Sequence, residues 1–136
     1  MEKKLSAKQI DGTVVLPASK SLMHRALMMA SLAKGESIIE GAPEIQSQDI
    51  QKTIQAMSQF AEISGRETLH VKGNGFCDTA GITVDAGESA STLRFLIPLF
   101  SICGAAFVGE GRLPKRPLDE YLNIFQQRGI VYQRGE

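Results

Sequence analysis

Strand-like and helix-like segments alternate along the chain, and the same order begins twice. Runs rich in β-branched or alternating apolar residues predict strands at residues 12–18, 36–41, 61–65, 68–73, 81–87, 105–111 and 130–133. Apolar residues three or four positions apart predict helices at residues 20–33, 47–57, 88–103 and 116–129. This order predicts an α/β (α+β) fold made of two βαβαββ units, of which the second is incomplete.

Local signals predict the ends and faces of several of these elements. Ser47 is the expected N-cap of the second helix, and Gly129 is the expected stop of the last one. Gly65 and the residue after it join two alternating runs, which predicts a hairpin. The apolar stripe of the first helix is expected at Leu22, Ala26, Met29 and Ala33.

Composition excludes several classes of protein. The chain has 136 residues, and its 15 basic residues balance 15 acidic ones, so it lacks the basic field that nucleic-acid or membrane-surface binding requires. It has no apolar leader and no run long enough to span a bilayer, and Cys77 and Cys103 fit a reducing compartment. His24 and His70 are isolated, so no metal site is expected. We expect a cytoplasmic protein without a nucleic-acid or membrane partner.

Cations at the start of the first predicted helix suggest an anion-binding site. The stretch "LPASKSLMHR" places Lys20, Ser21 and Arg25 in the first two turns. A helix N-terminus carries partial positive charge, so cations there are unfavourable unless an anion lies among them. Free N–H groups, hydroxyls, an ammonium and a guanidinium together suit a phosphate or carboxylate. A serine-capped, solvated first turn explains this motif equally well when it is taken alone.

A second strand-to-helix junction, "DAGESASTLR", is rich in small residues. Residues 89–92 cluster at the helix start, which allows the backbone to approach a ligand closely, and Arg94 follows in the first turns. The alternative is a serine-capped helix in which Arg94 pairs with Glu88 or Asp85. The alternative is somewhat favoured for this motif alone.

The third junction, "GEGRLPKRPLDE", places Arg112, Lys115 and Arg116 in a loop before the last helix. Charged loop residues are usually only solvated. In α/β units, however, such junctions lie at the carboxyl ends of strands, where ligands bind. Three of them in one short chain favour an anion site over coincidence.

These three motifs resemble the N-terminal portion of the 5-enolpyruvylshikimate-3-phosphate synthase family, in the family's order and spacing. The resemblance covers essentially the whole chain and identifies the repeated units as the enolpyruvyl transferase type. The family is much longer and has two domains. The resemblance implies that residues 1–15 form an opening strand that normally belongs to the other domain. Residues 16–136 would then be an incomplete N-terminal substrate-binding domain with units 16–80 and 81–136.

The resemblance also implies an activity. The family transfers the enolpyruvyl (carboxyvinyl) group of phosphoenolpyruvate to the 5-hydroxyl of shikimate 3-phosphate and releases phosphate, in aromatic amino-acid (chorismate) biosynthesis. Both substrates are multiply anionic, which accounts for the cations, and no cofactor is implied. The family's acid–base carboxylates have no counterpart in this sequence. The chain alone is therefore expected to be inactive without the remainder of the enzyme, its second domain.

Residue by residue, the resemblance gives Lys20 a catalytic role and contact with both substrates. It assigns Ser21 and Arg25 to shikimate 3-phosphate, and Ala90, Ser91 and Arg112 to phosphoenolpyruvate. Arg94 and Asp49 also match recurrent family positions, and we expect both to be structural.

The second motif departs from the family pattern. The family usually has Asn-Ser-Gly-Thr-Thr where this chain has "ESAST", so Glu88 replaces Asn and Ala90 replaces Gly. Our hypothesis is that the Ala90 methyl narrows the room for the inhibitor glyphosate more than for phosphoenolpyruvate. Glu88 places a negative charge near the anion site.

Three other interpretations compete with this one. The sister family, UDP-N-acetylglucosamine enolpyruvyl transferase, shares the chemistry but carries Lys-Asn where this chain has Lys20-Ser21. The chain could also be a non-catalytic fragment that binds shikimate 3-phosphate or another anion. An unrelated repeat-built α/β domain is the third interpretation, and the three motifs disfavour it.

Overall fold

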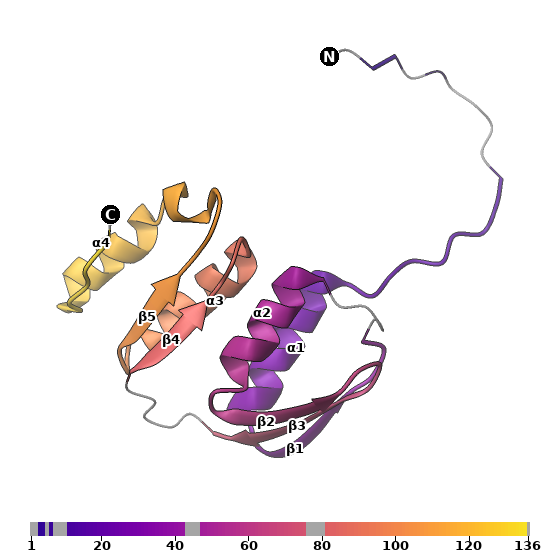
Figure 1. Cartoon of the computed structure of the whole chain (residues 1–136), viewed down its shortest axis with the longest axis horizontal. Coiled ribbons are helices and arrows are strands. Elements are labelled where there is room, and N and C mark those ends of the chain that lie inside the picture. Colours follow the sequence, from indigo (N-terminus) through magenta and orange to yellow (C-terminus); the bar gives the residue numbers. More distant parts are fainter. Residues whose placement is uncertain (1–2, 5, 7–10, 43–46, 76–80, 136) are drawn as a thin grey trace.

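The computed structural model describes residues 3–4, 6, 11–42, 47–75 and 81–135. The helices and strands follow the predicted alternation (Figure 1). In chain order they are α1 (Lys20–Leu32), β1 (Lys34–Ile39), α2 (Gln48–Met57), β2 (Ala61–Gly65), β3 (Leu69–Asn74), β4 (Ile82–Asp85), α3 (Ala90–Phe100), β5 (Ala105–Val108) and α4 (Asp119–Arg128), with a short 3-10 helix at Leu113–Lys115. The predicted α/β (α+β) class is confirmed, whereas the equivalence of the two repeated units stays a prediction.

The first sheet is antiparallel, has the order β1-β3-β2, and is covered on one face by α1 and α2 (Figure 1). The predicted hairpin is present as the β2–β3 pair. Residues of β3 alternate between buried and exposed, and its buried face includes Gly73. A Cβ at Gly73 would lie 2.3 Å from the carbonyl oxygen of Ala33, so the end of α1 packs directly on the strand backbone.

The second sheet consists of β4 and β5, which are parallel and are connected through α3. This is the crossover that a parallel pair requires. One hydrophobic cluster joins the two sheets, because Leu96 and Phe100 of α3 lie in it together with Met57 of α2 and Val71 of β3. The Phe60 and Phe100 rings meet edge to face, with centroids 5.5 Å apart. The two halves of the chain therefore share a core, and their helices have a fixed relation.

The strands predicted at 12–18 and 130–133 are wrong. Residues 11–19 extend away from the body without strand pairing (Figure 1), and Val14, Val15 and Leu16 are at least 79% exposed. Residues 130–133 are likewise in no strand. β-branched residues form a strand only where another strand supplies hydrogen-bond partners, and no described strand runs beside either segment.

The buried face of α1 also differs from the prediction. Met23, Leu27 and Ala30 face the core, whereas Leu22 and Met29 of the predicted stripe are 67% and 68% exposed. The helix is apolar on both sides, so spacing alone does not determine which side packs on the sheet.

Other local signals are confirmed. Ser47 caps α2, and α4 ends at Gly129, whose φ of 66° is the left-handed conformation that glycine favours. None of the helices within the described ranges has the length and apolar character needed to cross a membrane.

Candidate anion-binding site

Helices α1, α2 and α3 begin at the same end of the molecule (Figure 1). Each starts with a serine N-cap: the Oγ atoms of Ser19, Ser47 and Ser89 accept hydrogen bonds from the N–H groups of Leu22, Ile50 and Thr92. The capping serine uses one of the free N–H groups of each first turn and leaves others available. Three partly positive helix ends thus lie together, which is an electrostatic environment suited to anions.

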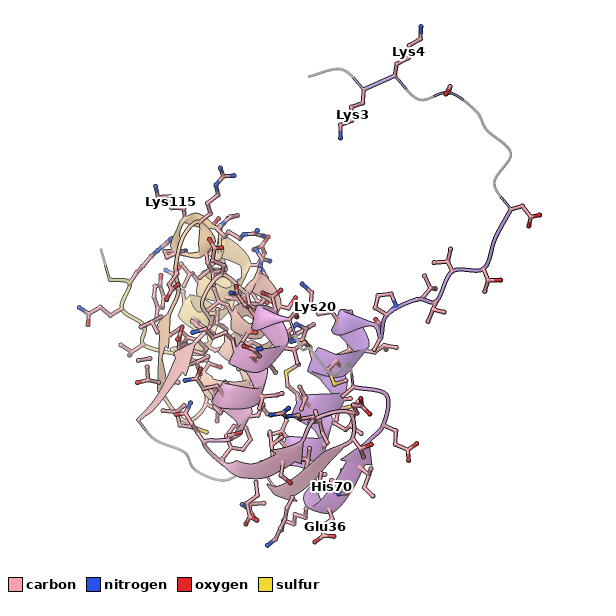
Figure 2. All side chains as sticks on the ribbon, turned by 45° about the vertical axis from the view of Figure 1, so that its right-hand side comes forward. Lys3, Lys4, Lys20, Glu36, His70 and Lys115 are labelled. Atoms are coloured by element: carbon pink, nitrogen blue, oxygen red, sulfur yellow. The ribbon has the colours of Figure 1, made fainter. Side chains whose placement is uncertain are left out.

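Lys20 connects the first turns of α1 and α2. Its Nζ donates to Oδ2 of Asp49 at 2.5 Å, and the side chains are 52% and 30% exposed. Asp49 offsets the unfavourable placement of a cation at the start of α1, and its own position in the first turn of α2 is favourable. Figure 2 shows the Lys20 side chain beside the upper ends of these two helices. Asp49 has the structural contact expected of it, and Lys20 is held in place while half of its surface stays open.

Ser21 and Arg25 lie one turn apart on the exposed side of α1. Nη1 of Arg25 donates to the carbonyl oxygen of Ser21 at 2.9 Å and to its Oγ in a short contact. The guanidinium lies 5.0 Å from the centroid of the Phe95 ring of α3, a cation–π distance. Arg25 is therefore oriented by α1 and α3 together.

Ala90 and Ser91 are the first two residues of α3 and are half-buried. No described residue accepts a hydrogen bond from their backbone N–H groups, whereas the next two, of Thr92 and Leu93, donate to Ser89. These two N–H groups are free donors at a helix start, as the predicted role requires.

Arg112 follows β5 in a loop that is joined to the start of α3. The Ala86 N–H donates to the carbonyl oxygen of Val108 at 2.9 Å, and the Glu110 N–H donates to that of Gly87 at 2.7 Å. The Arg112 side chain is exposed and has no partner among the described residues. Lys115 of the same motif lies at a distance from Lys20 (Figure 2), so the structure does not bring Lys115 to the start of α1.

Arg94 does not pair with either acidic residue considered for it. Its Nη2 donates to the carbonyl oxygen of Pro117 at 2.9 Å, and the Tyr121 hydroxyl donates to the Arg94 carbonyl oxygen at 3.0 Å. Arg94 thus joins α3 to the segment before α4, which is the structural role expected for it.

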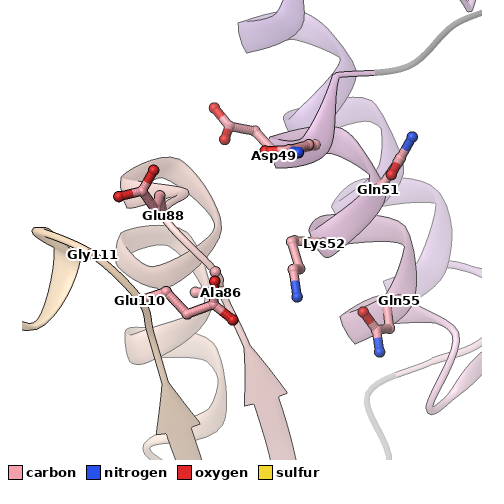
Figure 3. Close-up of a pocket in the computed structure, with 10 residues that line it drawn as sticks. Asp49, Gln51, Lys52, Gln55, Ala86, Glu88, Glu110 and Gly111 are labelled. Atoms are coloured by element: carbon pink, nitrogen blue, oxygen red, sulfur yellow. The ribbon is translucent and has the colours of Figure 1, made fainter.

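A pocket of about 600 Å³ separates α2 from the loops that follow β4 and β5 (Figure 3). Its lining is Gln48, Asp49, Gln51, Lys52, Gln55, Ala86, Gly87, Glu88, Glu110 and Gly111. None of the predicted substrate-binding side chains lines it. Three carboxylates against one ammonium make it unfavourable for a multiply charged anion. The helix starts, which offer N–H donors and cations, are therefore a better candidate than this pocket for an anion.

Two close contacts shape the loops around the pocket. Lys52 pairs with Asp85, whose Oδ1 also accepts from the Gly87 N–H at 2.9 Å. The hydrogen bond from Lys52 and then that from Gly87 lower the pKa of Asp85. The Glu88 carboxylate lies against Gly111, where an added Cβ would come within 1.7 Å of Oε1. Glu88, which replaces the family's Asn, thus lies against the residue that precedes Arg112.

Sequence reasoning missed the role of His24. It is only 1% exposed and bonds to Thr53 of α2, although its position in the sequence looks isolated. His24 follows Met23 and precedes Leu27 by three residues, so it lies on the buried face of α1. This spacing is the signal in the sequence that could have indicated its burial. Within the described ranges, no group of three or more His, Cys, Asp or Glu side chains could hold a metal ion, and Cys77 lies outside those ranges.

Comparisons with known proteins agree with one another. A family model described as EPSP synthase (3-phosphoshikimate 1-carboxyvinyltransferase) matches residues 5–135. The 3-phosphoshikimate 1-carboxyvinyltransferase of Clostridium novyi is 40% identical over 143 residues, which cover 96% of this chain and 32% of the relative. That of Clostridium kluyveri is 40% identical over 129 residues, covering 92% and 30%.

The fold has a counterpart among solved structures. An EPSP synthase from Acinetobacter baumannii superimposes with a TM-score of 0.71 at 22% identity, over 91% of this chain and 30% of that one. At 22% identity, this similarity shows a shared fold alone. The chain spans less than a third of the length of the two curated relatives described above.

Proposed function

The chain belongs to the EPSP synthase (3-phosphoshikimate 1-carboxyvinyltransferase) family, and on that basis we propose that it supplies substrate-binding groups of an enolpyruvyl transferase. The reaction joins phosphoenolpyruvate to the 5-hydroxyl of shikimate 3-phosphate and releases phosphate. The names of the curated relatives favour this reaction over that of the UDP-N-acetylglucosamine enolpyruvyl transferases.

The observation that carries the proposal is the meeting of three helix starts with Lys20 and Arg25 between them. Shikimate 3-phosphate would bind to Ser21 and Arg25, and phosphoenolpyruvate to the free N–H groups of Ala90 and Ser91 and to Arg112. Such charge-assisted and oriented donors are what phosphate and carboxylate groups require. Lys20 would turn from Asp49 toward both substrates, because half of its surface is open.

The chemistry is an addition followed by an elimination. A proton adds to the methylene carbon of phosphoenolpyruvate, and the 5-hydroxyl oxygen attacks C2 as it gives up its own proton to a base. The resulting tetrahedral intermediate expels phosphate while the new methyl group loses a proton and the carbon–carbon double bond re-forms. Protonation develops positive charge at C2, whereas the departing phosphate carries negative charge, which Lys20 and the helix starts would stabilise. The general acid and base of the family would come from the remainder of the enzyme.

The domain assignment belongs to the same proposal. Residues 16–136 would form part of the N-terminal substrate-binding domain, and residues 1–15 would belong to the other domain. The exposure of Val14, Val15 and Leu16 supports this, because an apolar segment of that kind is expected to pack elsewhere. A cytoplasmic location, without nucleic-acid or membrane partners, completes the proposal.

Calorimetric titration of the chain with shikimate 3-phosphate tests the proposal. We expect saturable binding that weakens roughly tenfold or more in Arg25→Ala, because a charge-assisted bond to phosphate is lost. Arg66→Ala is the matched control, since Arg66 is an exposed arginine in the β2–β3 turn, and it should bind as the unchanged chain does. A folded chain that does not bind, or equal losses in both variants, would contradict the proposal.

A further inference from the structure

A continuous chain of buried polar side chains connects α1, α2 and α3 beneath the candidate site. Nδ1 of His24 lies 2.8 Å from Oγ1 of Thr53, which lies 2.8 Å from Oγ1 of Thr92. Thr92 in turn donates to Oγ of Ser89 at 2.7 Å. All four residues are at most 1% exposed. We call these four residues the relay; it spans three helices without reaching solvent.

The direction of the hydrogen bonds assigns the tautomer of His24. The single hydroxyl proton of Thr92 is shared between Oγ of Ser89 and the carbonyl oxygen of Asp49, so Thr92 must accept the proton of Thr53. Thr53 then has no proton left and must accept from His24, which places the imidazole proton on Nδ1. Nε2 therefore carries no proton, and it is buried without a hydrogen-bond partner among the described residues.

Protonation of Nε2 would bury a charged N–H without an acceptor. The charged groups that face His24 are Lys20 and Arg25 on its own helix and Asp49 on α2, while α3 presents the Phe95 ring, 6.5 Å between centroids. Burial and the two cations lower the pKa of His24 by more than Asp49 raises it, so the pKa lies below its ordinary value. Burial therefore favours the neutral imidazole over the charged one.

One end and the middle of the relay contact the segments that would hold the substrates. At one end, Ser89 caps α3 by accepting from the Thr92 N–H, next to the N–H groups of Ala90 and Ser91, from which no described residue accepts. In the middle, Thr92 also donates to the backbone carbonyl oxygen of Asp49 at 3.3 Å, and the Asp49 side chain holds Lys20. The relay therefore sets the distance between the Lys20 side and the α3 side of the site.

We propose that His24 is a positioning residue that, as a neutral Nδ1–H imidazole, holds the starts of α2 and α3 against α1 through Thr53 and Thr92. It does not touch the substrates and acts through the groups that do. This inference rests on the proposed function for its effect on substrate binding, but the relay itself can be tested without a substrate.

Three variants distinguish a role of His24 in positioning the helix starts from a role in stabilising the core. His24→Asn keeps a polar group near the position of Nδ1, His24→Leu removes it, and Thr53→Val interrupts the relay without altering the histidine. Ser31→Ala is the matched control, because Ser31 is a fully buried polar residue of the same helix whose Oγ has no partner within the described part of the chain. Folding of each variant is checked by circular dichroism.

Shikimate 3-phosphate titrations should show weaker binding by roughly tenfold in His24→Leu and Thr53→Val, as expected when a buried hydrogen-bonded group loses its partner. His24→Asn should restore most of the affinity, and Ser31→Ala should leave it unchanged. If His24→Leu does not fold, Thr53→Val decides the matter. Folded relay variants that bind as tightly as the unchanged chain would overturn the proposal.

Nuclear magnetic resonance tests the relay without a substrate. The ¹⁵N shifts of His24 should report a neutral imidazole protonated on Nδ1, and Thr53→Val should shift the amide signals of Asp49 and Ala90 more than Ser31→Ala does. A proton on Nε2, or equal shifts in the two variants, would overturn the relay. If the unchanged chain binds no shikimate 3-phosphate while these signals behave as expected, the proposed function fails and the relay stands.

Discussion

At the scale of single residues, the candidate site depends on side chains whose neighbours orient them. Lys20 is held by Asp49, and Arg25 is held by Ser21 and the Phe95 ring. The motifs in the sequence point to Lys20 and Arg25 as candidate anion-binding residues, because cations at a helix start are unfavourable unless an anion lies nearby. They do not identify His24, since its partners Thr53 and Thr92 come from other helices and no spacing along the chain relates them.

The neutral state of His24 predicts how stability depends on pH. Its pKa in the folded chain lies below the ordinary value of 6.5, so below that pH the unfolded chain binds a proton that the folded chain does not. The free energy of unfolding should therefore fall as the pH drops from 6.5 toward the folded pKa, by at most about 1.4 kcal/mol per pH unit for one proton. Denaturant titrations from pH 7.5 to 5.5 measure this.

His24→Asn is the control for that dependence, because asparagine does not titrate. The difference in unfolding free energy between the unchanged chain and His24→Asn should vary with pH over that window. A difference that is constant from pH 7.5 to 5.5 would show that His24 does not resist protonation. Asp85 does not interfere, since its lowered pKa affects stability only below its ordinary value of 3.8, where the contribution is lost as the pH falls.

Ala90 gives a second prediction at this scale. It is the half-buried first residue of α3, beside the N–H groups proposed for phosphoenolpyruvate. The test uses a graft in which this chain replaces the matching segment of the Clostridium novyi relative. In that graft, Ala90→Gly should lower the glyphosate concentration that halves activity, with a smaller change in the KM for phosphoenolpyruvate. Unchanged inhibition by glyphosate would remove the steric explanation.

At the scale of elements, close backbone packing fixes where the first turns lie. Gly73→Ala places a Cβ 2.3 Å from the Ala33 carbonyl oxygen, so α1 must move off the sheet. Overpacking of this kind costs about 1–3 kcal/mol, and we expect a loss in that range in the free energy of unfolding. Lys72→Ala, on the exposed face of the same strand, should change stability by less than about 0.5 kcal/mol. Equal effects in the two variants would mean that the contact between α1 and β3 is looser than described.

The elements show what can be predicted from a sequence of this kind and what cannot. The Ser47 cap, the β2–β3 hairpin and the stop at Gly129 depend on residues close in sequence, and these predictions are confirmed. The strand at 12–18 and the buried face of α1 depend on which other segment packs there, which local patterns do not contain.

At the scale of the whole molecule, one shared core places the three helix starts side by side. The cluster that contains Met57, Val71 and Leu96 joins the first sheet to the second half of the chain. The relay adds a polar connection across the same three helices.

The most direct test of the central claim is an activity assay on a graft. This chain replaces the matching segment of the Clostridium novyi relative, and phosphate release is measured with phosphoenolpyruvate and shikimate 3-phosphate together. We predict release that requires both substrates and that Lys20→Met abolishes in a folded protein. A folded graft that releases no phosphate, or that uses UDP-N-acetylglucosamine instead of shikimate 3-phosphate, would contradict the account.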